Sequence, residues 1–152
     1  MKEPLTLGWR EWCVLPDIGI PAIKAKIDTG AKTSALHTFK IDPFTENGQD
    51  FVRFLVHPLQ KNETVVLECV APIKDERMVS DSGGHKEMRY IIETLVRIGD
   101  KGWPIDISLT NRDTMRFRML LGRRAMQEQV VIAPAASYLM GRIKAKRLYG
   151  LI

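Results

Sequence analysis

The chain has 152 residues, of which 45% are hydrophobic and 27% are charged. This composition is typical of a globular domain with a hydrophobic core, and it excludes a low-complexity or disordered chain. The sequence contains no apolar run of about 18 residues, and its first residues lack the apolar segment of a signal peptide. We therefore expect one domain over residues 1–152, located in the cytoplasm and without membrane contact.

The chain is basic, with 23 lysines and arginines against 18 aspartates and glutamates. The surplus is concentrated in residues 112–124 and in the tail segment 142–147. Such a balance favours an acidic partner or substrate without identifying it. A nucleic-acid partner is disfavoured, because no recognised nucleic-acid motif accompanies the charge.

Short strands separated by turns are predicted for the first two thirds of the chain. Residues 9–15 and 20–27 form a predicted hairpin around the turn 16–19, and in the second strand apolar residues alternate with Lys24 and Lys26. That hairpin leads directly into Asp28. Further strands are predicted at 35–41, 51–57, 64–71, 88–98, 103–110 and 117–121, with turns at 42–48, 81–84 and 99–102.

One short helix is predicted at 122–128, which lacks β-branched residues and contains good helix formers. The sequence shows no internal repeat and no linker. The last segment, 134–152, could pack on the domain, cross to a partner subunit or be partly mobile.

Asp28 follows an apolar strand and precedes Thr29 and Gly30. A carboxylate at this place stands on a tight turn, where glycine lets the backbone approach it closely and the threonine hydroxyl can brace the loop. The three residues alone are a weak signal, since turns use aspartate and glycine in any case. Their context, an apolar strand before them and Leu120-Leu121-Gly122 far downstream, makes the signal stronger.

Several segments together carry a resemblance to a known family. They are Gly8–Trp12, Leu15–Ile20, Lys24–His37, Asp81–His85 and Arg116–Arg123. Over nearly its whole length the chain resembles the retropepsin-like aspartic peptidases. It is most similar to a bacterial family of small members that have been labelled ATP-dependent zinc proteases and are often encoded beside ATP-grasp ligases that add glutamate to proteins.

The resemblance implies an all-β, closed barrel-like acid-protease fold with one short helix, and an aspartic endopeptidase activity that needs no cofactor. Asp28 becomes the catalytic aspartate, and the stretch 80–90 becomes a flap over bound peptide. The residues that would support the catalytic loop are Thr29, Gly30, Ala31, Leu121 and Gly122. The residues that would form the flap or bind substrate are Ser82, Gly83, Gly84, His85, Lys32 and Arg123.

One catalytic loop per chain predicts a symmetric homodimer, because an aspartic peptidase needs two carboxylates that share a proton. Asp81-Ser82-Gly83 also matches the pattern, but the residues before it are too polar for a buried strand, so a flap tip or a plain surface turn is the better interpretation. A second function remains open: a binding module that holds acidic peptides or regulates a neighbouring ligase with little hydrolysis.

A metallopeptidase is the third alternative, which would use His37, His57 and His85. These histidines lie far apart and no HExxH helix occurs, so we expect no zinc. No phosphate-binding glycine loop supports ATP binding either.

Cys13 and Cys69 stand alone in strand-like segments and are predicted to be reduced core thiols. The cluster Arg112, Arg116, Arg118, Arg123 and Arg124 forms either a solvated basic face or a patch for an acidic peptide.

Overall fold

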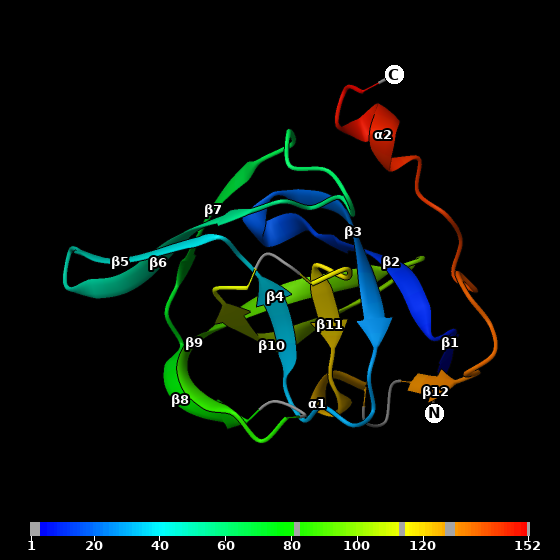
Figure 1. Cartoon of the computed structure of the whole chain (residues 1–152), viewed down its shortest axis with the longest axis horizontal. Helices are drawn as coiled ribbons and strands as arrows, with labels where there is room; N and C mark the ends of the chain where they lie inside the picture. Colours follow the sequence, from blue (N-terminus) through cyan, green and yellow to red (C-terminus); the bar gives the residue numbers. More distant parts are fainter. Residues whose placement is uncertain (1–3, 81–82, 113–114, 127–129, 152) are drawn as a thin grey trace.

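The computed structural model describes residues 4–80, 83–112, 115–126 and 130–151. Strands dominate it, in agreement with the predicted all-β class (Figure 1). Among these residues, no helix is both long and apolar enough to cross a membrane.

A hairpin of β2 (Arg10–Leu15) and β3 (Ile20–Ile27) opens the main sheet, with a single 3-10 turn between the two strands. Pro16 begins this turn, where a missing N–H costs nothing, and Gly19 ends it with a φ of 74° that glycine adopts without steric cost. Every second side chain of β2 is buried. The predicted hairpin is confirmed. The alternation predicted for β3 is confirmed too, since Ile23, Ala25 and Ile27 are buried and Lys24 and Lys26 are not.

The main sheet closes on itself into a ring. Its remaining strands are β4 (Ser34–His37), β8 (Asp75–Ser80), β9 (Lys86–Ile98), β10 (Lys101–Thr110) and β11 (Met119–Leu121). Hydrogen-bonded neighbours follow the order β10, β4, β11, β3, β2, β9, and β9 pairs back onto β10. These six strands therefore leave no open edge between them, and β8 pairs with β9 outside the ring.

Aliphatic side chains from the ring form the core. Ile23, Leu36, Ile92, Ile107 and Met119 are completely buried. Each such side chain stabilises the fold by about 1.5–3 kcal/mol relative to an exposed position. Both cysteines belong to the same core, as predicted.

A three-stranded antiparallel sheet of β5 (Lys40–Glu46), β6 (Gln49–Val56) and β7 (Leu67–Pro72) extends to one side of the ring (Figure 1). The prediction of a turn over 42–48 was too long. Strand pairing continues to Glu46, where Phe44 stacks on Phe51 across the hairpin at 5.5 Å. The chain reverses only at Asn47 and Gly48, whose positive φ angles suit a two-residue hairpin turn.

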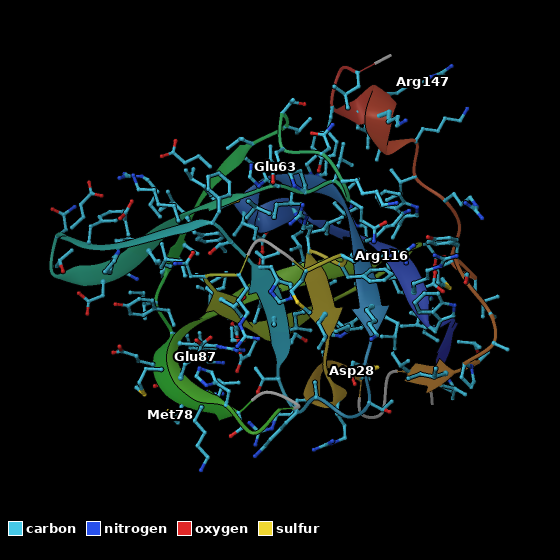
Figure 2. The ribbon with its side chains drawn as sticks, viewed as in Figure 1. Asp28, Glu63, Met78, Glu87, Arg116 and Arg147 are labelled. Atoms are coloured by element: carbon cyan, nitrogen blue, oxygen red, sulfur yellow. The ribbon has the colours of Figure 1, made fainter. Side chains whose placement is uncertain are left out.

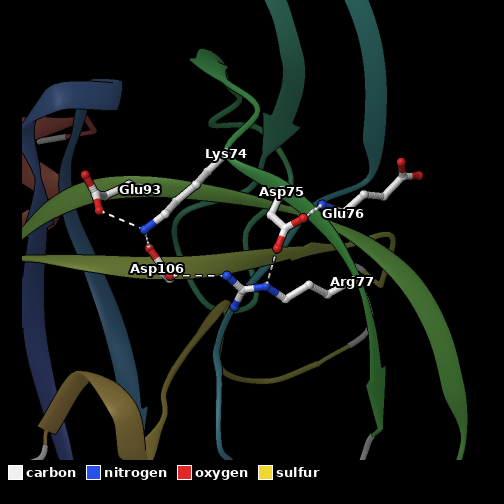
Figure 3. Close-up of polar contacts among 6 residues, drawn as sticks. All are labelled: Lys74, Asp75, Glu76, Arg77, Glu93 and Asp106. Carbon is white, nitrogen blue, oxygen red and sulfur yellow. Dashed lines mark hydrogen bonds and ion pairs between the residues drawn. The ribbon is translucent and has the colours of Figure 1, made fainter.

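The polar stretch before residue 81 forms β8, an edge strand that pairs with β9. Ion pairs hold it in place: Lys74 Nζ contacts Glu93 at 3.0 Å and Asp106 at 2.8 Å, and Arg77 Nε contacts Asp75 at 2.7 Å (Figure 3). The hydrogen bond from Lys74 to Asp106 raises the pKa of the Lys74 ammonium group, and the Arg77 hydrogen bond lowers the pKa of Asp75. The strand is therefore exposed, held by its pairing with β9 and accompanied by surface ion pairs.

A buried carboxylate joins the two ends of the chain. Glu11 is completely buried, and its Oε2 accepts hydrogen bonds from the backbone N–H groups of Gly8 at 2.7 Å and Leu139 at 2.9 Å. Its Oε1 accepts one from Met140 at 3.1 Å. Nearby, β1 (Leu5–Leu7) pairs in parallel with β12 (Val130–Ile132). Both ends are thus fastened to the ring.

The structure contains two short helices, α1 (Arg123–Met126) and α2 (Ala145–Leu148), where one was predicted. The first lies within the predicted range 122–128, whose last two residues fall outside the described part of the chain. The second has no apolar period of its own and is held by tertiary contacts: Ala145 packs with Ala22 and Leu59 in a small core. Of the alternatives for the C-terminal segment, the structure shows packing on the domain itself.

Candidate active site

The loop that carries Asp28 begins where β3 ends, and β11 lies beside it. Because β11 runs parallel to β3, Leu121 stands opposite Ile27, and the Leu121 carbonyl accepts a hydrogen bond of 2.9 Å from the Asp28 N–H. The two segments are 93 positions apart in the sequence. The predicted juxtaposition of the Asp28 loop with Leu120–Gly122 is therefore present.

The carboxylate of Asp28 is held by its own turn. Its Oδ1 accepts a hydrogen bond of 2.9 Å from the Gly30 N–H, and the Asp28 carbonyl accepts one of 3.3 Å from Ala31. A Cβ atom on Gly30 would lie 3.2 Å from Oδ1, so glycine allows this close approach. Asp28 is half-buried, whereas Thr29 and Gly30 are exposed. A fixed carboxylate is thus presented to solvent.

A layer beneath the loop supports it. Gly122 is buried, and its N–H donates to Ser34 Oγ at 3.0 Å. A Cβ atom at Gly122 would lie 2.6 Å from the Thr33 carbonyl carbon and 2.8 Å from the Ser34 nitrogen, so only glycine fits. Ser34 was not among the predicted support residues. Its burial directly after an exposed loop depends on tertiary contacts that local sequence does not reveal.

Arg123 braces the loop from α1. Its backbone N–H donates to the Ala31 carbonyl at 2.7 Å, and its Nη1 donates to the Thr29 carbonyl at 2.9 Å. The next residue, Arg124, donates its N–H to the carbonyl of Lys32, whose side chain is exposed beside the loop. Arg123 was predicted as a flap or substrate residue, and in this structure its guanidinium contacts the Asp28 loop itself.

The predicted flap is a hairpin of β8 and β9, paired up to Ser80 and Lys86. Gly83, Gly84 and His85 are exposed at its turn, and Gly84 has a φ of 78°. Asp81 and Ser82 lie outside the described residues. In the view of Figure 1, this turn and the Asp28 loop both lie at the lower end of the ring. The hairpin is present, and its closing over peptide stays a prediction.

The arginines of the segment 112–124 do not form one patch. Arg118 is buried, with 6% of its surface exposed, Arg123 binds the Asp28 loop, and Arg116 lines a cavity on another part of the surface. In Figure 2, Arg116 lies well above Asp28, towards α2. The interpretation as a single basic face was therefore wrong, because these arginines lie in different environments.

The histidines occupy separate environments. His37 Nδ1 is 2.8 Å from Thr110 Oγ1, and the ring of His57 stacks on Phe39 with centroids 4.1 Å apart. Both histidines are buried, whereas His85 is exposed on the β8–β9 turn. Across the described ranges, no group of three or more His, Cys, Asp or Glu side chains could hold a metal ion.

Comparison with known proteins agrees with this geometry. A family model described as the retropepsin-like aspartic endopeptidase RimB matches residues 6–143. The chain belongs to this RimB-like family. The resemblance drawn from the sequence is thereby confirmed, and so is the retropepsin-like fold class.

Curated relatives of this RimB-like chain are longer proteins. A protein of Shewanella pealeana is 39% identical over 148 residues, and one of Desulfotalea psychrophila is 43% identical over 142 residues. Both are named probable alpha-L-glutamate ligase. The matches cover 95% and 93% of this chain but only 32% and 31% of the relatives. The chain thus spans about a third of their length.

A solved structure shares the fold. It is a Legionella pneumophila protein of unknown function, 26% identical, with a TM-score of 0.74. The match covers 91% of this chain and 99% of that protein. The same strand arrangement therefore forms a complete folded chain there, without the additional length of the ligase-named relatives.

Proposed function

We propose that this RimB-like chain is an aspartic endopeptidase whose active site combines the Asp28 residues of two subunits. The observation that carries the proposal is the position of Asp28: a half-buried carboxylate on a tight turn that β11, Gly122 and Arg123 brace from below. The family match supports the same chemistry. The proposed location of this reaction is the cytoplasm.

The chemistry requires two carboxylates. Within the described residues, the Asp28 carboxylate accepts a hydrogen bond from the Gly30 N–H, and the proposed second carboxylate is the Asp28 of a second subunit. Two carboxylates about 3 Å apart share one proton, so that one removes a proton from the attacking water while the other protonates the leaving nitrogen. A two-fold axis through the Asp28 loops would bring these two groups together.

The glycine-containing turn of β8–β9 is the proposed cover for bound peptide. Gly83 and Gly84 permit the backbone movement that closure needs, and His85 and Lys32 offer polar contacts to the substrate. The ligase-named relatives suggest a functional link to a glutamate ligase. Glutamate-rich peptides are accordingly a substrate class to test, in line with the net charge of +5.

The test is cleavage of a proteome-derived peptide library by the wild type and by Asp28→Asn at several pH values. Wild type should cleave at defined positions and the variant should not, because the amide cannot exchange the proton. Specific activity should also rise with protein concentration across the dimer dissociation range. Cleavage by a verified monomer that is unchanged in Asp28→Asn would contradict the mechanism.

A binding module is the second candidate, favoured by the finding that the chain corresponds to about a third of proteins named as ligases. In that role Asp28 would hold a partner without hydrolysis. Analytical ultracentrifugation together with the library distinguishes the two. A protein that stays monomeric at all concentrations, binds peptide and cleaves nothing is a module.

A further inference from the structure

A second concave site lies away from the Asp28 loop. It is a cavity of about 690 Å³ between Trp12 of β2, the connection 58–62 after β6, and the C-terminal segment from Ile143 to Leu151. This volume lies within the range of about 300–1,000 Å³ that ligand sites occupy. Figure 2 shows Arg147 at the end of the molecule opposite to Asp28, with Arg116 between them.

The lining of this cavity is strongly basic. Among the described residues, no aspartate or glutamate lines it, whereas six cations do: Lys24, Lys61, Arg116, Lys144, Lys146 and Arg147. Glu63 follows the lining residue Asn62 in the chain but is not among the lining residues. The chain has 23 lysines and arginines and a net charge of +5, and six of these cations are gathered at this one site.

These cations are not used for internal ion pairs. Among the described residues, none of the six forms a salt bridge, although Lys24 Nζ donates to Gln60 Oε1 at 3.3 Å and lies 5.2 Å from the Trp12 ring centroid. Like charges that converge on a concavity repel one another, and an anion bound there relieves that repulsion. The charge therefore indicates an anionic ligand.

The wall of the cavity is fixed to the ring. The Tyr149 hydroxyl donates to the Ala22 carbonyl of β3 and accepts a hydrogen bond of 3.3 Å from the Ala22 N–H. Ala145 packs with Ala22 and Leu59. The basic segment 144–147 is thus held in a defined position on β3, and it presents its charges to the cavity instead of moving freely.

We infer that this cavity binds a carboxylate-rich stretch of the substrate protein at a distance from the Asp28 loop. The inference rests on the proposed peptidase function and adds a site that selects the substrate. Trp12, Leu59 and Ile143 supply apolar surface between the cations, which suits the methylene groups of glutamate side chains. The cations come from four separate segments, a spacing that suits a peptide with successive carboxylates.

Binding at this cavity would make the peptidase more selective. A substrate held at the cavity raises the effective concentration of its remaining chain near Asp28, provided that the connecting segment can span the two sites. Substrates that carry an acidic stretch would then be cleaved in preference to those that lack one. Charge contacts of this kind weaken as the salt concentration rises.

The experiment measures fluorescence anisotropy of labelled octaglutamate with full-length Asp28→Asn protein, and labelled octaglutamine is the uncharged control peptide. The cavity variant carries Lys144→Gln and Arg147→Gln. The matched control carries Lys101→Gln and Arg97→Gln, which are also exposed and also remove one lysine and one arginine charge. Octaglutamate should bind more tightly than octaglutamine, and the cavity variant should weaken it about tenfold while the control changes it less than twofold.

Equal affinities of the cavity variant and the matched control would overturn the inference, as would equal binding of octaglutamate and octaglutamine. An octauridylate that binds the cavity more tightly than octaglutamate would also overturn it in favour of a nucleic acid. A different result would refute the proposed function alone. If octaglutamate binds as expected but the wild type cleaves no peptide, the acidic-peptide site is supported and the peptidase activity is refuted. If the wild type cleaves peptides and the cavity variant binds normally, only the cavity site is refuted.

Discussion

Replacing Gly122 by alanine tests whether the layer beneath the Asp28 loop positions the carboxylate. The new Cβ would lie 2.6 Å from the Thr33 carbonyl carbon and 2.8 Å from the Ser34 nitrogen, both of which are backbone atoms. Ordinary contact begins near 3.4 Å, so the strand must move by several tenths of an ångström. Overpacking of this kind costs about 1–3 kcal/mol, and contact with backbone places Gly122→Ala near the upper value.

Urea unfolding of Gly122→Ala should therefore show a loss of about 3 kcal/mol, with a midpoint of thermal unfolding roughly 6–12 °C lower. Peptidase activity should fall by up to about 100-fold, because the Asp28 loop moves with the strand. Gly102→Ala is the matched control: its Cβ meets nothing closer than 3.5 Å, and stability should change by less than about 0.5 kcal/mol. Stability and activity of Gly122→Ala equal to this control would refute the reasoning.

Four further outcomes are expected. Ser34→Ala leaves the buried Gly122 N–H without its acceptor and should cost about 1–3 kcal/mol in urea unfolding, less than additively with Gly122→Ala because the two residues share one contact. Glu11→Gln places an amide against three backbone donors and should cost about 2–3 kcal/mol by the same measurement, whereas an unchanged midpoint would show that the carboxylate is not needed. Burial raises the pKa of the Cys69 thiol to about 12 and that of Cys13 further, so the native protein at pH 8 should not react with a thiol reagent, while the urea-unfolded protein should react at both cysteines. Burial also raises the pKa of Tyr149 from 10.0 to about 12, which favours the protonated hydroxyl in the folded state; its stabilising contribution is present below pH 10 and is lost between pH 10 and 12, so the stability difference between wild type and Tyr149→Phe should shrink over that range.

Local sequence was sufficient for features that depend on neighbouring residues. The alternation through β3, the turn at Gly19 and the short helix after Gly122 follow from side-chain period and backbone preference, which act within a few residues. Neither side-chain period nor backbone preference predicts the helix α2. Its Lys146 and Arg147 are exposed at the basic cavity, and the segment is helical because Ala145 and Tyr149 dock on β3.

Local sequence also could not predict which charged side chains are buried. Arg118 and Arg116 are two positions apart, yet the first is buried and the second lines the basic cavity. In the sequence, Glu11 looks like an ordinary glutamate of a strand. Its three hydrogen-bond donors are the N–H groups of Gly8 and of Leu139 and Met140, and the last two residues are 128 and 129 positions away in the chain. Such contacts form only when distant segments meet.

The sequence by itself determined that the chain is built of strands, which rests on residue type and short spacing. The resemblance to retropepsin-like peptidases, and with it Asp28 as the candidate carboxylate, rests on motifs spread over nearly the whole chain. Only the tertiary structure decided what surrounds that carboxylate and where the basic side chains gather. The pairing of β11 with β4 places Gly122 against Thr33, and the folding of the whole chain brings four separate basic segments to one cavity. Those positions depend on which strands pair, and strand pairing is set by the packing of the whole core.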